Sequence, residues 1–120
     1  MDSIYIMNKD EHEYFVYKTD RLIYTNKLDN IISFERQGRY VNVTSLNAET
    51  VNISCSLNSL LNLLTCRDFV MVNRGTIVNF ARVNGLRDMC VITEKELKYE
   101  VSRPRLKYVK SRLLKQILPD

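Results

Sequence analysis

Short runs of β-branched and aromatic residues dominate the chain from Tyr14 onward. Residues 39–44 and 50–54 alternate apolar and polar side chains with a period of two, which is typical of a strand with one buried face. Gly38 and residues 46–49 interrupt these runs and predict turns. The predicted strands are residues 14–18, 21–24, 31–36, 39–44, 50–54, 69–72, 76–78, 81–86, 89–93 and 98–101.

Two segments have the periodicity of a helix instead. The first follows Ser56, a good N-cap residue, and places four leucines on one face: Leu57, Leu60, Leu61 and Leu64. The second begins near Pro104, which suits a first helical turn, and its opposite face is basic. Its apolar face consists of Leu106, Val109, Leu113 and Ile117. The expected fold is therefore mostly β, with two helices, the second C-terminal and basic.

The length of 120 residues fits one domain with a single principal core. We expect residues 1–13, which are polar and acidic, to form a loose N-terminal lead-in, and residues 14–120 to form the domain. Asn84 with Gly85, and residues 93–96, are further predicted turns.

Composition excludes several classes of protein. The chain is 45% hydrophobic with only three glycines and two prolines, so it is neither collagen-like nor disordered. No apolar run approaches the ~20 residues of a membrane span, and the N-terminus lacks a basic region followed by an apolar stretch. We therefore expect a cytoplasmic protein with no membrane partner.

The residues that carry catalytic or metal chemistry are sparse. Cys55, Cys66 and Cys90 form no close pair, and His12 is the one histidine, so a structural zinc site is not expected. The cysteines are interpreted as reduced, mostly buried thiols. No glycine-rich phosphate loop occurs, and three glutamates between residues 94 and 100 read as a solvated hairpin. We predict no catalytic residue, no metal and no cofactor.

Positive charge is concentrated near the C-terminus. Residues 101–120 hold six basic side chains and one acidic side chain, in a chain of net charge +4. This asymmetry indicates an anionic partner, although a solvated charged helix would look the same.

Three predicted strand breaks carry arginine or asparagine. They are residues 36–40, with Arg36 and Arg39; residues 73–76, with Asn73 and Arg74; and residues 102–105, with Arg103 and Arg105. Arginine can bond guanine bidentately and asparagine can bond adenine, while both also hold phosphates. An ordinary polar turn is the alternative for each segment taken alone.

Taken in order, five phrases of the sequence resemble the LytTR-type DNA-binding domain of bacterial response regulators. The resemblance runs from about Tyr14 to Leu118. The phrases are Ile31-Ile32-Ser33-Phe34-Glu35, Gly38-Arg39-Tyr40-Val41-Asn42-Val43, Ser56-Leu57-Asn58-Ser59-Leu60, Phe69-Val70-Met71-Val72-Asn73-Arg74-Gly75-Thr76-Ile77-Val78-Asn79 and Val101-Ser102-Arg103.

This resemblance implies short antiparallel strands in small sheets, and DNA binding by loops that enter successive major grooves. The expected function is transcription regulation in a bacterial two-component system, with double-stranded promoter DNA as the partner. Family members commonly act as homodimers on direct repeats, often through an attached receiver domain. No receiver is encoded in these 120 residues, so an upstream receiver domain or a partner regulator would have to supply that control.

The resemblance, together with the basic segments, gives the candidate DNA-binding residues. Candidates for base or groove-edge contacts are Arg36, Arg39, Arg74 and Arg103. Candidates for positioning the DNA backbone are Tyr40, Asn73, Arg105 and Lys107.

The chain also departs from the family pattern. Met71 and Asn73 stand where arginine and histidine are usual, and Gly75 and Thr76 stand where serine and an aromatic residue are usual. These departures support an alternative, a protein-interaction module with the same fold that has lost DNA readout. A third interpretation is single-stranded RNA binding by stacking on tyrosine and phenylalanine, although such residues more often fill a β core. The aromatic residues concerned are Tyr5, Tyr14, Phe15, Tyr17 and Tyr24.

Overall fold

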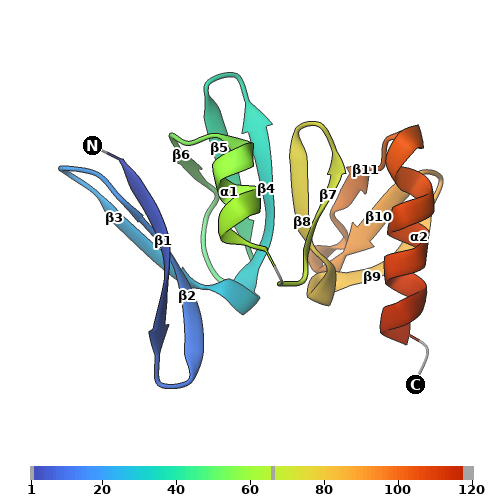
Figure 1. The fold of residues 1–120 in the computed structure, drawn as a ribbon, viewed down its shortest axis with the longest axis horizontal. Coiled ribbons are helices and arrows are strands. Elements are labelled where there is room, and N and C mark those ends of the chain that lie inside the picture. The colour runs from blue at the N-terminus through green and yellow to red at the C-terminus, as the bar shows by residue number, and fades with distance from the viewer. Residues whose placement is uncertain (1, 66, 118–120) are drawn as a thin grey trace.

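The strands form three antiparallel sheets, side by side in Figure 1, in a computed structural model that describes residues 2–65 and 67–117. The N-terminal sheet has the order β1-β2-β3, the central sheet β6-β5-β4-β8-β7 and the C-terminal sheet β11-β10-β9. The strands of the N-terminal sheet are β1 (Ser3–Lys9), β2 (His12–Lys18) and β3 (Ile23–Lys27). Those of the central sheet are β4 (Ile31–Gln37), β5 (Tyr40–Ser45), β6 (Val51–Ile53), β7 (Phe69–Asn73) and β8 (Thr76–Asn79).

The C-terminal sheet and the helices complete the fold. The remaining strands are β9 (Val83–Arg87), β10 (Cys90–Thr93) and β11 (Lys98–Glu100). The helices are α1 (Leu57–Leu63) and α2 (Arg103–Ile117), and short 3₁₀ turns span Leu28–Asn30, Phe80–Arg82 and Glu94–Glu96. The mostly β prediction with two helices is thus confirmed.

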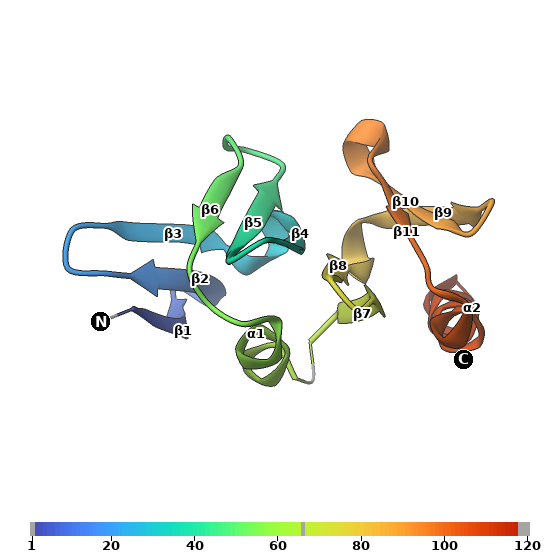
Figure 2. The ribbon, with the colours of Figure 1, turned by 90° about the horizontal axis from the view of Figure 1, so that it is seen from above.

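Strands β4, β8 and β7 of the central sheet are largely buried on both faces, which explains why they are mostly apolar, whereas β5 and β6 alternate apolar and polar residues. On one face Phe34 packs with Phe15 of β2 and Leu60 of α1 in a first core. On the other face Val72 packs with Val109 of α2 in a second core, so the expectation of a single principal core is wrong. Seen from above in Figure 2, the N-terminal sheet and α2 lie at opposite ends of the molecule. The central sheet therefore holds its hairpins in a fixed frame between two packed layers.

The sequence predicted the start of α1 correctly. The Ser56 hydroxyl accepts a hydrogen bond from the Ser59 N–H at 3.0 Å, as an N-cap should. The predicted turn at residues 93–96 is also present, as the 3₁₀ turn Glu94–Glu96.

The prediction of a loose lead-in over residues 1–13 is wrong for residues 3–9, which form β1. β1 pairs with β2 along its whole length, from Ser3 opposite Lys18 to Lys9 opposite His12. Ile4 and Ile6 point into the first core, and the apolar run of residues 4–7 is what the interpretation of residues 1–13 as polar overlooked. β2 itself crosses the predicted boundary between residues 13 and 14.

The predicted turn at Asn84 and Gly85 is also wrong. Both residues lie inside β9, where Gly85 pairs with Ile92. The chain turns instead at Asp88 and Met89, whose φ angles are 52° and 64°. The pairing of β9 with β10 has overridden the local turn preference of an Asn-Gly pair.

Cys55 and Cys90 are half-buried free thiols. Burial raises the pKa of the Cys55 thiol to about 11, so this thiol stays protonated at neutral pH. Among the residues that the structure describes, no helix is long and apolar enough to cross a membrane. The predictions for Cys66, for the side chain of Ile117 and for residues 118–120 lie outside the described residues.

Candidate nucleic-acid interface

The β4–β5 hairpin ends in a two-residue turn made by Gly38 and Arg39, closed by the pairing of Gln37 with Tyr40. Gly38 has a φ of +62°, whereas Arg39 keeps a negative φ, which matches a tight hairpin turn with glycine first. Arg36 and Arg39 are exposed, and Tyr40 is 48% exposed. The turn geometry therefore presents two guanidinium groups and a phenol to solvent.

The β7–β8 hairpin ends in a turn made by Arg74 and Gly75. Asn73 stabilises this turn, because its Oδ1 accepts a hydrogen bond from the Gly75 N–H at 2.8 Å. Its Nδ2 donates to the main-chain carbonyl of Glu100 in β11 at 2.7 Å. The amide of Asn73 thus serves the protein's own structure, while Arg74 is exposed at the tip.

The two hairpin tips are bonded to each other. The main-chain N–H of Arg36 donates to the Gly75 carbonyl at 2.8 Å. Just below, Glu35 pairs with Thr76 in the β4–β8 ladder. Arg36 and Arg74 therefore project from one continuous piece of sheet rather than from two independent loops.

The start of α2 is bonded to β7. The Ser102 N–H donates to the Val72 carbonyl at 3.0 Å, and the Arg105 Nε donates to the Met71 carbonyl at 2.9 Å. The Arg105 guanidinium also lies 5.0 Å from the centre of the Tyr108 ring. Arg103 and Lys107 are exposed on the same helix.

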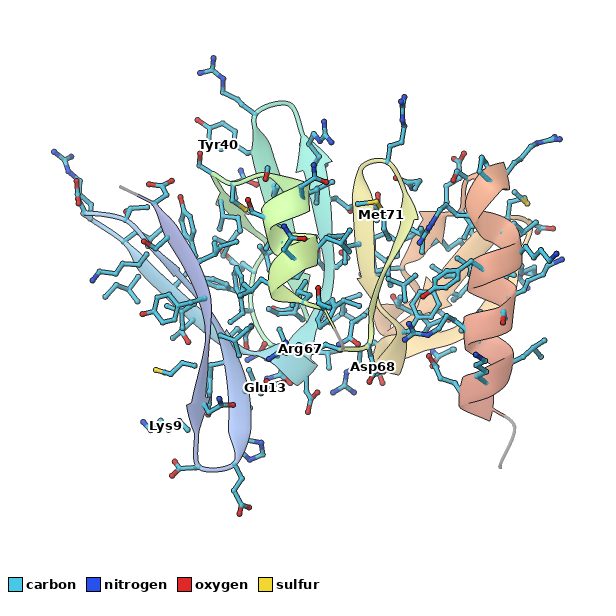
Figure 3. The ribbon with its side chains drawn as sticks, in the orientation of Figure 1. Lys9, Glu13, Tyr40, Arg67, Asp68 and Met71 are labelled. Atoms are coloured by element: carbon cyan, nitrogen blue, oxygen red, sulfur yellow. The ribbon has the colours of Figure 1, made fainter. Side chains whose placement is uncertain are left out.

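These three segments lie along one edge of the molecule, at the top of Figure 1, and we call them the basic edge: residues 36–40, 73–76 and 102–107. Tyr40 lies toward this edge in Figure 3. An open hollow of about 780 Å³ between the two hairpins is lined by Arg36, Arg39, Tyr40 and Arg74, among others. The structure thus brings four of the eight predicted residues around one hollow and places Arg103 and Lys107 farther along the edge.

The arginines of the basic edge are free to bind an external anion. Within the described residues, the salt bridges of arginine involve Arg67, Arg82 and Arg112, none of which belongs to this edge. Arg105 alone among the predicted arginines has its side chain bonded to the protein, and only through Nε. Unpaired guanidinium groups keep their donors for phosphates or base edges.

Three of the residues that depart from the family pattern, Asn73, Gly75 and Thr76, are accommodated by contacts within the protein. Asn73 is bonded as described above, and Thr76 is only 6% exposed. Gly75 has an ordinary φ, and a Cβ added there would meet Asn73 Oδ1 at 3.8 Å, an ordinary contact. The departures leave the exposure of Arg74 untouched.

Sequence reasoning missed the contribution of α1 to the hollow. Ser56 and Asn58 at the start of α1, together with Met71, line the same space as Arg36 and Arg74. No local signal could have placed them there, because the hollow exists only once α1 packs against the central sheet.

One carboxylate lies just behind the basic edge. Burial raises the pKa of Glu35 above its ordinary value. Burial also raises the pKa of Tyr99, and the nearby charge of Glu35 adds to this, while a hydrogen bond from Ser33 opposes it. Ionisation of Glu35 therefore costs more free energy in the folded protein than in water.

The comparison with protein families agrees with this geometry. The sequence model of the LytTr DNA-binding domain matches residues 20–114. The chain belongs to the LytTR family of DNA-binding domains. LytTR domains are DNA-binding domains of response regulators. The LytTR match starts after β1 and β2, so this hairpin lies outside the matched segment.

A solved structure has the same fold. It is the LytTr DNA-binding domain of a methyl-accepting/DNA response regulator from Bacillus cereus, with a TM-score of 0.70 and 18% sequence identity. The match covers 82% of this chain and 94% of that chain. A comparison with curated proteins found no match. The LytTR fold is thereby established for this chain independently of the motifs quoted above.

Proposed function

We propose that this LytTR domain binds double-stranded promoter DNA sequence-specifically, as part of a bacterial transcriptional regulator. The basic edge inserts its two hairpin tips and the start of α2 into neighbouring major grooves. The observation that carries the proposal is the alignment of exposed arginines, free of salt bridges among the described residues, along one rigid edge.

The dimensions of the molecule support this mode of binding. The basic edge, from the β4–β5 tip to the start of α2, runs along the longest axis of the molecule in Figure 1, so it can lie along a duplex with its hairpin tips facing the grooves. Hairpin tips are also narrow enough to enter a groove about 12 Å wide.

The proposed roles differ between residues. Arg36, Arg39, Arg74 and Arg103 contact base edges or the groove edge, because their side chains are exposed. Tyr40, Lys107 and the terminal nitrogens of Arg105 hold phosphates. Asn73 holds the β7–β8 turn in place rather than contacting DNA, because its Oδ1 and Nδ2 are already hydrogen-bonded to the main chain.

The cytoplasm is the place where such a regulator acts, and we place this domain there. Binding as a homodimer to direct repeats, and control by a receiver domain or partner regulator, are part of the same proposal.

In vitro selection from a random duplex library, followed by a footprint on genomic fragments, tests the function. A conserved motif protected on one face of the duplex is expected. Recovery of no motif at all, with the folded protein, would favour the interaction-module alternative.

A further inference from the structure

The N-terminal sheet packs only one of its faces on the protein. Ile4, Ile6, Phe15, Tyr17 and Tyr24 point into the first core. Because side chains alternate along a strand, residues at odd positions of β1 and β3 and at even positions of β2 point the other way. We call this the outer face. Of the five aromatic residues proposed for stacking, Tyr5 and Tyr14 are on it.

The centre of the outer face is apolar and open. Tyr5 is 42% exposed, Met7 is 40% exposed and Ile23 is 67% exposed. Val16 is only 3% exposed although it belongs to neither core, so its neighbours on this face cover it. Tyr5 pairs with Val16 and Met7 pairs with Tyr14, which puts the two tyrosines one row apart on adjacent strands. Tyr5, Met7 and Tyr14 therefore adjoin one another, whereas Lys18 and Thr25 lie between them and Ile23. Exposed apolar surface on a soluble domain often marks a binding site.

The charged residues of the outer face are lysines. They are Lys9, Lys18 and Lys27, one on each strand. This is unexpected from composition, because residues 1–30 hold six acidic and four basic side chains. The acidic residues are elsewhere, for example at the β1–β2 turn, where Asp10 and Glu11 lie.

Two further carboxylates of this region are held on the other side of the sheet. Asp2 accepts a hydrogen bond from the Tyr17 hydroxyl at 2.7 Å. Glu13 accepts hydrogen bonds from Arg67 at 3.1 and 2.5 Å. In Figure 3 Glu13 points toward Arg67, whereas Lys9 points away from the rest of the molecule. The sheet thus separates its charges and leaves a cationic, aromatic face.

We propose that the outer face is a second nucleic-acid site, which binds single-stranded DNA. Bases stack on Tyr5 and Tyr14, and Lys9, Lys18 and Lys27 neutralise the phosphates on either side. Aromatic platforms flanked by cations bind single strands in this way, because every base has a stacking surface. The site lies on residues separate from the basic edge and does not depend on duplex binding.

The exposed apolar side chains favour thymine, and the lysines disfavour a second copy of the chain. Met7 and Ile23 suit the methyl group of thymine, which uracil lacks. A symmetric dimer through this face would bring lysine against lysine. Single-stranded DNA meets both the charge and the apolar centre.

Fluorescence anisotropy with 5′-labelled (dT)₁₂ tests the site on the full chain. We expect (dT)₁₂ to bind, and the double variant Tyr5→Ala, Tyr14→Ala to bind about tenfold more weakly or worse. Lys18→Gln should reduce the slope of log K against log salt by about 0.7, the value for one phosphate contact on a single strand. The matched control Lys98→Gln, on β11, should change neither quantity. Thermal melting checks that each variant is folded. If the double variant does not fold, Lys18→Gln alone tests the site.

Three results would overturn the proposal. The first is a folded double variant, or Lys18→Gln, that binds (dT)₁₂ as the native chain does. The second is binding of (rU)₁₂ as tight as that of (dT)₁₂, which would exclude selection of DNA. The third is a dimer in sedimentation that Tyr5→Ala converts to a monomer, which would make this face a contact between copies. Failure of duplex binding would leave all these readouts unaffected, so the two proposals fail separately.

Discussion

The side-chain amide of Asn73 bonds the main-chain carbonyl of Glu100 at 2.7 Å, and so connects the β7–β8 tip to the strand that leads into α2. The same side chain closes the turn that presents Arg74. Asn73 therefore sets the relative placement of Arg74 and Arg103, the two arginines at either end of this connection.

Replacing Asn73 with alanine should remove both bonds and lower the free energy of unfolding by about 1–2 kcal/mol. Duplex affinity should fall as well, similarly for all DNA sequences, because the spacing of the tips is loosened. Urea denaturation and anisotropy with the selected duplex measure the two effects. The control Asn84→Ala, exposed on β9, should change neither. An affinity loss confined to one base pair, at unchanged stability, would instead show that Asn73 contacts DNA.

Replacing Arg74 with alanine should weaken binding to the selected duplex by about 1–3 kcal/mol and relax specificity at one base pair. The reason is that Arg74 is exposed at a tip and makes no contact on which the fold depends. Competition against duplexes with single substitutions measures this. Lys115→Ala removes a positive charge near the far end of α2 and should retain both affinity and specificity. Equal losses in the two variants would reduce the role of Arg74 to general charge.

Lys107→Gln should behave differently from Arg74→Ala. If Lys107 holds a phosphate, the slope of log K against log salt decreases by about 0.9, and affinity falls equally for all sequences. The slope is measured by titrations at salt concentrations from about 50 to about 200 mM, over which the effect of phosphate contacts is large. A slope equal to that of the native chain would show that Lys107 does not contact a phosphate.

Glu35→Gln should stabilise the protein at neutral pH. Burial raises the folded-state pKa of Glu35 above its ordinary value of 4.5, so ionisation costs more in the folded chain than in the unfolded chain. That cost is absent below pH 4.5 and develops as the pH rises through the folded-state pKa. The variant should therefore exceed the native chain in free energy of unfolding at pH 7, and the difference should shrink on acidification. A difference that is constant between pH 4 and 7 would contradict this assignment.

The sequence predicted those parts of the fold that local chemistry determines. Gly38 marked a hairpin tip because its φ is positive, and Ser56 marked the start of α1 because its hydroxyl caps the helix. The alternation along residues 39–44 predicted β5. Residues 3–9 were missed because the acidic residues around them made the segment look polar, although residues 4–7 are an apolar run.

For the candidate site, the sequence suggested which residues could bind DNA but not how they are arranged. That Arg36 and Arg74 are joined follows from a main-chain bond between two hairpins about forty residues apart. The internal use of Asn73 depends on Glu100 of β11, which is 27 residues away in the sequence. Neither relationship has a local signature, so the choice between a DNA contact and a structural role needed the three-dimensional structure.

In the proposed mode of binding, the basic edge reads the major groove. Protection of guanine N7 from dimethyl sulfate tests it most directly, because N7 lies in that groove. We predict protected guanines in two neighbouring major grooves on one face of the selected duplex, with protection at one of them lost in Arg74→Ala. Guanine N7 reactivity that stays unchanged throughout a duplex fully bound by the protein would contradict the account.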